Sequence, residues 1–220
     1  MQRASFGSIV VLVALGVPGA GWAQERPGAI YLTATATVPR GEGVTGTSSQ
    51  TYATAPGGWT RGWAVGGGVF VSRHASVEVE LSRTGVMRAT EPSRYDMTFH
   101  EERRDTFLTF GIRLHARPGR AVDLEPVVGF DLVYGDAWSQ VDYDHPYGTP
   151  YTTPRYRQDL ATVAGFSTGL DVRAGGRHAA AVVSFRLHRT YRGNDYRSEY
   201  PGSDEQAWTI RPGAGVRFDF

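Results

Sequence analysis

The sequence Trp208-Thr-Ile-Arg-Pro-Gly-Ala-Gly-Val-Arg-Phe-Asp-Phe220 alternates between two kinds of residue without a break. Every second residue from Trp208 to Phe220 is apolar, whereas the positions between them include Arg211, Arg217 and Asp219. Successive side chains of a β-strand point to opposite faces, so this segment predicts a strand with one apolar and one charged face. In a chain that also carries an export signal, such a pattern predicts a strand that crosses a membrane.

The first residues have the organisation of an export signal. A short positive region ends at Arg3, an apolar run covers residues 9–17, and Gly21 and Ala23 place small residues where signal peptidase cleaves. The apolar run is shorter than the roughly 20 residues of a transmembrane helix. We therefore expect residues 1–23 to be a cleaved signal peptide and residues 24–220 to form an outer-membrane β-barrel domain.

Composition excludes several classes of site. The chain contains no cysteine, which excludes disulfides and thiolate metal sites. Its formal net charge of +1 gives no sign of nucleic-acid binding. We expect neither a cofactor nor a metal.

Eight alternating segments follow the signal, separated by glycine, proline and polar clusters. They cover residues 29–38, 62–72, 76–83, 104–116, 122–134, 160–172, 178–191 and 207–220. The connections alternate in length: residues 73–75, 117–121 and 173–177 are short, whereas residues 39–61, 84–103, 135–159 and 192–206 are long. In an up-and-down barrel this places all tight turns at one rim. The sequence thus predicts an all-β, eight-stranded antiparallel transmembrane β-barrel.

The charged residues of these segments share one face. In residues 122–134, for example, Leu124 and Val128 alternate with Glu125 and Asp131. Unpaired charges are costly in a dry core, so we expect the apolar face to meet lipid and the polar face to fill the lumen. The residues expected to form a salt-bridged, hydrated interior are Glu78, Glu80, Arg113, Glu125, Asp131, Asp171, Arg186, Arg211, Arg217 and Asp219. Alternatively, these charged residues line a narrow or gated path for ions through the barrel.

The signal, the eight strands, the sorted loops and the terminal aromatic residue resemble the OmpA/OmpX-type small outer-membrane β-barrels. Phe218 and Phe220 resemble the assembly signal of that family. The resemblance implies recognition by periplasmic chaperones and the barrel-assembly machinery, and residence in the outer membrane of a Gram-negative bacterium. It is architectural and names no activity. We expect a monomer.

Two sets of residues near the long connections indicate contacts outside the barrel. Arg61, Arg83, Arg104 and Arg189 face outward there, where guanidinium groups bind lipopolysaccharide phosphates or snorkel to the interface. Residues 142–156 are rich in tyrosine and proline, as in surfaces that bind an extracellular ligand, although an idle loop is an equal alternative. Asp142, Asp144 and His145 match no calcium-loop spacing.

His188-Arg-Thr190 resembles the His-x-Ser motif of the lipid A 3-O-deacylase barrels. The resemblance implies that His188 is a base and that Thr190 stands where that family has a serine nucleophile. The alternative is an interior polar pair, and the sequence identifies no acid partner for His188. Two hypotheses therefore remain: a non-enzymatic barrel that serves envelope integrity or surface binding, and an enzyme that modifies lipid A. A pore is a third.

Overall fold

The computed structural model describes residues 27–41, 45–48, 51–54, 57–92, 97–116, 118, 120–144, 148–176, 178–192 and 205–220. The predicted signal peptide, residues 1–23, lies outside these ranges. Within them the regular elements are β-strands, and no helix has the length and hydropathy needed to cross a membrane.

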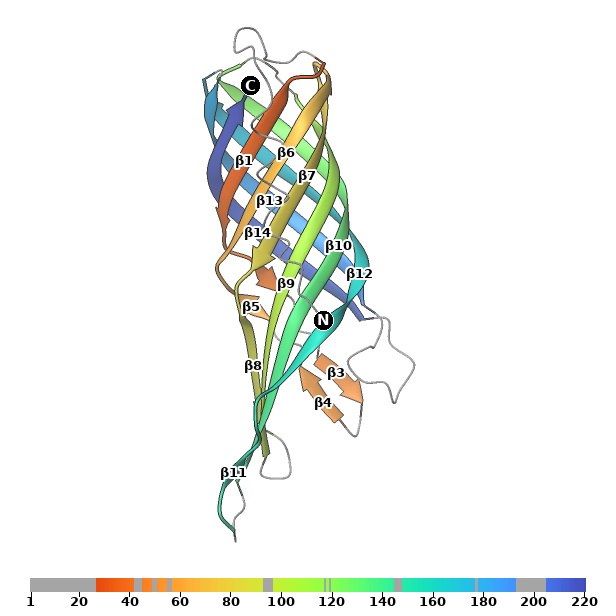
Figure 1. Ribbon diagram of the computed structural model, residues 1–220, viewed down its shortest axis with the longest axis vertical. Helices are drawn as coiled ribbons and strands as arrows, with labels where there is room; N and C mark the ends of the chain where they lie inside the picture. The colour runs from red at the N-terminus through yellow and green to blue at the C-terminus, as the bar shows by residue number, and fades with distance from the viewer. Residues whose placement is uncertain are drawn as a thin grey trace, which may run out of the picture.

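Eight strands form a closed antiparallel ring (Figure 1). Each strand pairs with the next one in this order, and β1 also pairs with β14, which closes the ring. This arrangement confirms the predicted eight-stranded barrel. The strands are β1 (Ile30–Thr37), β6 (Gly62–Ser72), β7 (Ala75–Thr84), β9 (Met97–Leu114), β10 (Val122–Tyr143), β12 (Tyr156–Gly175), β13 (Ala179–Arg192) and β14 (Glu205–Asp219).

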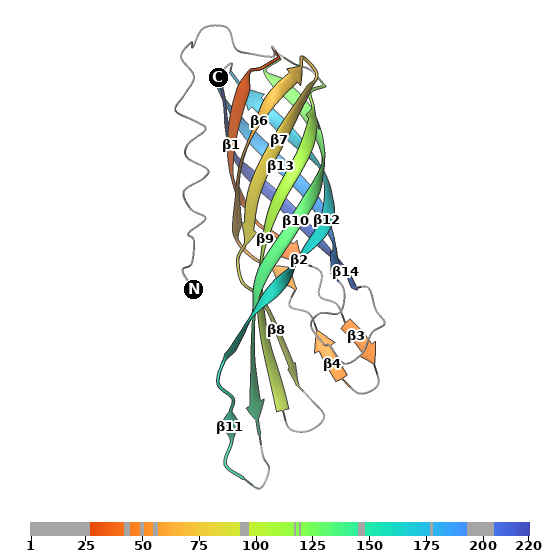
Figure 2. The same ribbon diagram turned by 45° about the vertical axis from the view of Figure 1, so that its right-hand side comes forward.

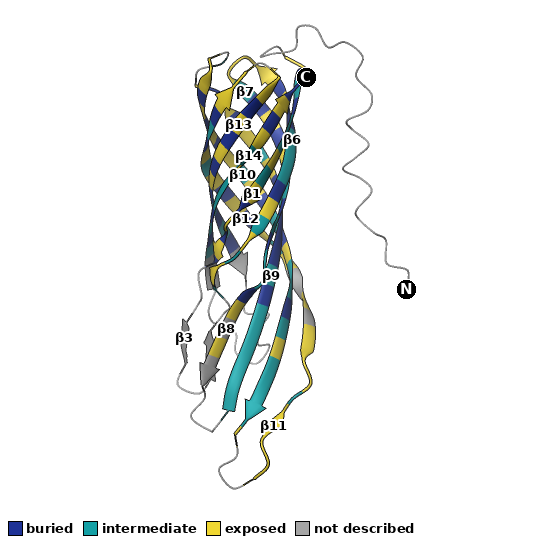
Figure 3. Ribbon diagram, turned by 90° about the vertical axis from the view of Figure 1, so that its left-hand side faces the viewer, coloured by how far each residue is buried: buried dark blue, intermediate teal, exposed yellow. Residues whose placement is uncertain are grey.

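The barrel is polar inside and apolar outside. Val128 is 57% exposed on the outer face of β10, whereas Glu125 on the inner face of the same strand is fully buried. Figure 3 shows buried and exposed residues alternating along the barrel strands in that view. Soluble proteins bury apolar side chains and expose charges, so this inverted distribution requires an apolar solvent around the barrel. A closed ring also leaves no unpaired strand edge in that solvent, which is the condition for spanning a bilayer with strands.

All the short connections lie at one end of the barrel, as predicted. Here β6 joins β7, β9 joins β10 and β12 joins β13 through residues 73–74, 115–121 and 176–178. The C-terminal strand also ends there (Figure 1). We call this the short-turn end and the opposite one the long-loop end.

The structure corrects the prediction that residues 84–103 and 135–159 are long loops. β9 begins at Met97, and its pairing with β10 continues without interruption to Met97 and Tyr143. β8 (Met87–Pro92) pairs with β9, and β11 (Tyr151–Thr152) pairs with β10. We call β8, β11 and the parts of β9, β10 and β12 over residues 97–103, 135–143 and 156–163 the sheet extension (Figure 2).

The outer part of the extension escaped prediction because neither of its faces is buried. β9 residues 97–102 are all intermediate in exposure, without the alternation of the barrel segments. A strand without one buried face carries no period-two apolar pattern. The predicted loop 39–61 likewise contains short strands, β2 (Arg40–Gly41), β3 (Thr45–Ser48), β4 (Thr51–Thr54) and β5 (Gly58–Trp59). β2 pairs with β14 and with β5, and β3 pairs with β4.

Candidate functional site

Arg113 is the centre of the ion-pair network inside the barrel. It projects from β9, is buried, and donates from Nε to Glu78 over 2.7 Å. Its Nη1 donates to Glu125 and to Asp171, each over 2.6 Å. Arg186 also binds Asp171. The planar guanidinium offers five donors in a fixed fork, so one arginine can join carboxylates from three strands.

A second arginine extends this network to the closing seam. Arg217 on β14 donates to both oxygens of Glu125 over 2.9 Å and from Nε to Asp219 over 2.7 Å. Arg173 reaches Asp219 over 3.1 Å. The guanidinium of Arg217 lies 3.9 Å from the ring centre of Tyr31, a cation–π contact between the two strands that close the barrel.

Asp131 organises the part of the interior nearer the long-loop end. It accepts hydrogen bonds from Thr109 over 2.6 Å, Ser167 over 3.0 Å and His188 Nδ1 over 2.8 Å. Arg211 pairs with Glu80 from across the lumen. The Nε2 atom of His188 and the Nε and Nη1 atoms of Arg211 have no protein partner there. Buried polar atoms of this kind are normally satisfied by internal water.

The structure places all ten predicted interior residues on the inner face, none more than 8% exposed. The predicted interior set did not include every buried polar residue of the lumen. Tyr31, Ser76, His115, Asp123 and Arg173 are also buried there. Four of them follow the same alternation as a predicted neighbour two residues away, so strand parity would have found them. Tyr31 stood on a strand without charged residues and gave no such signal.

His188 has the acid partner that the sequence did not identify. The carboxylate of Asp131 holds its Nδ1, although β10 and β13 are separated in the ring by β12. Thr190 is buried on the same face of β13. Because His188 Nε2 makes no hydrogen bond, it does not bind the Thr190 hydroxyl as a catalytic base would bind its nucleophile.

An apolar hollow of about 480 Å³ lies on the outer face of the barrel and is lined by residues such as Phe110, Val128 and Phe130.

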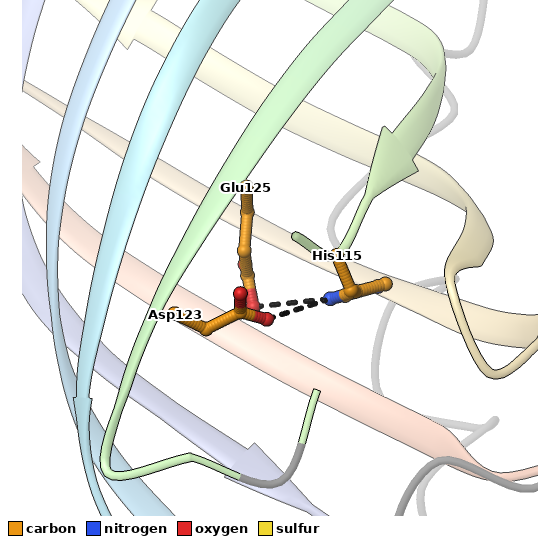
Figure 4. A group of neighbouring side chains, drawn as sticks. All are labelled: His115, Asp123 and Glu125. Atoms are coloured by element: carbon orange, nitrogen blue, oxygen red, sulfur yellow. Dashed lines mark hydrogen bonds and ion pairs between the residues drawn. The ribbon is translucent and has the colours of Figure 1, made fainter. Parts of the chain in front are cut away.

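A cluster that shares Glu125 with the ion-pair network lies at the short-turn end. His115 follows β9, and Asp123 and Glu125 lie on the inner face of β10 (Figure 4). His115 Nδ1 is 3.2 Å from Glu125 Oε1 and 3.6 Å from Asp123 Oδ2. All three side chains are buried, which removes the competition of bulk water for these contacts.

The predicted lipid-contacting arginines lie near the long-loop end. Arg83 is 3.5 Å from Asp136, Arg104 lies over Trp138 at 5.7 Å, and Arg189 lies over Trp208 at 5.0 Å. Arg61 is exposed just before β6. Guanidinium groups stacked on tryptophan keep part of their edge available to another anion.

Two further arginines, one just before β12 and one in it, lie in the same region, and the sequence analysis did not select them. Arg155 and Arg157 lie over Trp138 at 5.4 Å and 5.7 Å. Arg155 pairs with Glu102 and Arg157 with Asp136. The hydrogen bond to Asp136 raises the pKa of Arg157 above its ordinary value. We call Arg83, Arg104, Arg155 and Arg157, which surround Trp138 and Asp136, the arginine collar.

A row of hydrogen bonds crosses the sheet extension. His100 contacts Thr90 through Nδ1 over 3.3 Å and Asp142 through Nε2 over 2.8 Å. Hydrogen bonds from Thr152 and from His100 lower the pKa of Asp142 below its ordinary value. The row joins β8, β9, β10 and β11. His145, which the sequence analysis considered beside Asp142 and Asp144, lies outside the described residues.

The predicted assembly-signal residues lie at the short-turn end of the closing seam. Phe218 and Phe220 both point outward and are exposed. The backbone N–H of Phe220 donates to the carbonyl of Ile30 on β1 over 2.9 Å.

No protein-family model matches this sequence, and a search of curated proteins finds no match. Solved structures resemble its fold. Ail, the attachment invasion locus protein of Yersinia pestis, is 14% identical, with a TM-score of 0.43 over 87% of this chain and 99% of its own. The outer membrane protease OmpT from Escherichia coli is 10% identical, with a TM-score of 0.48 over 92% and 100%. The outer membrane protein OprG from Pseudomonas aeruginosa is 10% identical, with a TM-score of 0.47 over 91% and 99%.

At these identities the likeness concerns the fold alone. The architecture, a closed ring of strands with an apolar exterior and a charged interior, is that of an outer-membrane β-barrel. The narrower resemblance to the OmpA/OmpX type stays a prediction.

Proposed function

We propose that this protein is a non-enzymatic outer-membrane barrel that holds its sheet extension outside the cell and binds lipopolysaccharide phosphates through its arginine collar. The observation that carries the proposal is the position of the collar. Arg83 and Arg104 lie at the point where the pairing of β7 with β9 ends. Arg157 pairs with Trp138 across β10 and β12 at the base of the extension. In the proposed orientation, this is the height at which the barrel strands leave the apolar layer of the membrane.

The chemistry of the collar suits a phosphate. Arginine binds phosphate bidentately, and its charge persists at every physiological pH. Asp136 and Glu102 hold Arg157 and Arg155 in place, so the guanidinium groups are ordered before a ligand arrives. Ordering groups in advance lowers the entropic cost of binding. Snorkelling at the interface, the alternative for these arginines, requires no such fixed partners.

The test compares lipopolysaccharide binding by two sets of variants of the refolded full-length barrel in detergent. Replacing Arg83, Arg104, Arg155 and Arg157 by alanine should weaken binding of purified lipopolysaccharide about tenfold or more, a loss of about 1.4 kcal/mol or more. The matched control replaces Arg73 and Arg120, which are exposed at the short-turn end. Equal affinities of the two variants would contradict the proposal.

The other two functions have separate readouts. A deacylase would change the acylation of lipid A in cells that express the protein, and we expect mass spectra of lipid A to stay unchanged. The missing hydrogen bond between His188 Nε2 and a nucleophile supports this expectation. A pore would conduct in planar bilayers, and we expect a silent bilayer because side chains fill an interior of eight strands.

A further inference from the structure

We propose that one acyl chain of lipopolysaccharide binds in the hollow on the outer face of β9, β10 and β12, and that Arg189 on β13 binds a phosphate of the same lipid. The inference rests on the proposed binding of lipopolysaccharide, to which it adds a second, largely apolar subsite. Arg189 is not part of the arginine collar, and the hollow, of about 480 Å³, opens to the lipid-facing surface.

The hollow lies between two rows of side chains that cross the strands of the barrel. One row consists of Phe110, Phe130 and Phe166, which are cross-strand partners on β9, β10 and β12. The other row contains Ile112 and its partner Val128. These five side chains are exposed on the outer face, and all of them line the hollow. The hollow therefore has two apolar walls that an alkyl chain can contact along its length.

The floor of the hollow carries no outward side chain. Glu78, Gly111 and Gly129 complete its lining, and they are consecutive partners across β7, β9 and β10. They occupy inner-face positions: a Cβ atom at Gly129, for example, would lie 3.2 Å from Oγ of the buried Ser167. Because successive residues of a strand point to opposite faces, the outer surface between the two rows is backbone. The hollow is thus a trough that runs across the strands.

Arg189 continues the phenylalanine row at the upper border of the apolar surface. It is the cross-strand partner of Phe166. Phe110 is four residues from the short-turn end of β9, whereas Arg189 is ten residues from that end of β13. The outward residues of β13 from Ala179 to Leu187 are all apolar. Ten residues rise about 25 Å along a strand tilted by about 40°, which is the height of the apolar band of an outer-membrane barrel.

The length of the trough matches one acyl chain. From Arg189 to Phe110 the row crosses from β13 through β12 and β10 to β9, three strand spacings that cover about 14 Å. The hydrocarbon core of a bilayer is about 30 Å thick, so the chains of one leaflet cover about 15 Å. A lipid whose phosphate lies at Arg189 can therefore lay one chain along the trough as far as Phe110.

Two aromatic rings hold Arg189 in position. Its guanidinium lies 5.0 Å from the ring centre of Trp208, its partner on β14. The rings of Trp208 and Phe166 are perpendicular to each other, with centres 6.4 Å apart. A stacked guanidinium has its N–H donors at the edge of its plane, where they bind phosphate. In the proposed orientation this end of the trough lies in the outer leaflet, so the phosphate belongs to lipopolysaccharide.

The test uses the full-length barrel in phosphatidylcholine vesicles that contain a small fraction of lipid A with a photoreactive diazirine on its acyl chains. After irradiation, mass spectrometry identifies the cross-linked peptides. We expect lipid A to label peptides of β9, β10 and β12 several times more than peptides of β1, which lies four strands from β10 in the ring. Phosphatidylcholine with the same photoreactive chain is the control and should label both walls equally. Equal labelling by lipid A would overturn the inference.

Two variants test the two halves of the subsite. Ile112→Trp fills the trough, and Arg189→Gln removes the charge that binds phosphate. Each should lower the labelling of this wall by lipid A, relative to phosphatidylcholine, by about tenfold, the loss typical of a hydrogen bond to a charged group. Val69→Trp is the matched control on the outer face of β6 and should leave the labelling unchanged. Wild-type labelling in both Ile112→Trp and Arg189→Gln would contradict the inference.

The alanine variant of the arginine collar separates this inference from the proposed function. If lipid A labels the trough of that variant as it labels wild type, the trough and Arg189 bind lipid A by themselves, and the role of the collar fails. If the collar variant loses lipopolysaccharide binding while lipid A labels both walls of the wild type equally, the collar stands and the acyl-chain subsite fails.

Discussion

Strands β9 and β10 pass through two environments, and the same backbone ladder is stabilised differently in each. Inside the barrel their side chains divide strictly, with Arg113 and Glu125 buried and Ile112 and Val128 exposed. In the outer part of the sheet extension the division disappears, and the contacts include ion pairs and hydrogen bonds near the surface, such as that of His100 with Asp142. Pairing between the strands continues unchanged across the boundary.

The difference separates what holds strands together from what places them in a bilayer. Backbone pairing needs only neighbouring strands, whereas insertion needs an apolar outer face and a closed, neutralised interior. The barrel should therefore be sensitive to changes in charge on either face. The extension should tolerate the same changes, because water solvates its charges.

The largest expected effect comes from removing the centre of the interior network. Arg113→Leu leaves Glu78, Glu125 and Asp171 without their shared cation, and loss of one partner of a buried pair typically lowers stability by about 3–5 kcal/mol. The measurement is urea unfolding in lipid vesicles, followed by tryptophan fluorescence. Arg88→Leu is the matched control in the extension, where an exposed pair with Glu102 should contribute about 0–1 kcal/mol. If both variants lost the same free energy of unfolding, ion pairs in the barrel interior and in the extension would contribute equally to stability, contrary to this comparison.

The next effect tests the outer face. Val128→Arg places a charge in the middle of the apolar band, where lipid-facing arginine typically costs about 2–4 kcal/mol. The fraction of protein inserted into vesicles should fall, as should the free energy of unfolding of the inserted form. Tyr156→Arg introduces the same charge at an exposed position of the extension and should alter neither quantity. If Val128→Arg inserted as well as wild type, the band would not be the lipid-facing surface.

The sequence predicted the barrel well because a bilayer imposes a pattern on every strand that crosses it. The alternation of Trp208–Phe220 follows directly from having lipid on one side and a polar lumen on the other. Residues 97–102 lacked such a constraint, so their strand could not be recognised. The pair Asp131–His188 was also missed, because it joins strands that are not neighbours in the ring. Alternation assigns a face, but it does not say which residues meet across the lumen.

A smaller effect should follow from filling the space beside Tyr31. A Cβ atom at Gly68 would lie 2.5 Å from the Tyr31 hydroxyl, so the tyrosine ring rests against the glycine. Gly68→Val must displace the ring from Arg217, and overpacking of this kind typically costs about 1–3 kcal/mol. A folded barrel migrates differently from the unfolded chain on a denaturing gel unless the sample is heated. The variant should lose the mobility of the folded form at a lower heating temperature than wild type. Gly148→Val, at an exposed turn of the extension, should leave that temperature unchanged.

The smallest effect concerns the hydrogen-bond row of the extension. The pKa of Asp142 is lowered by hydrogen bonds from Thr152 and His100, so its carboxylate stabilises the folded extension at pH values above the ordinary aspartate pKa of about 3.9. That contribution is lost as the pH falls through the lowered value. At pH 7, the backbone amide hydrogens around Val141 and Thr153 should exchange with solvent faster in Asp142→Asn than in wild type, by no more than severalfold. Below the lowered pKa the two proteins should exchange at the same rate.

The measurement is hydrogen exchange by mass spectrometry, with wild type and variant compared at each pH so that the intrinsic pH dependence of exchange cancels. Peptides of the barrel interior serve as the internal control, since Asp142 lies outside the closed ring and opening of the extension is a local event. Faster exchange in barrel peptides of Asp142→Asn would show that the two regions unfold together. Unchanged barrel peptides would show that β9 and β10 each contain two independently stable parts.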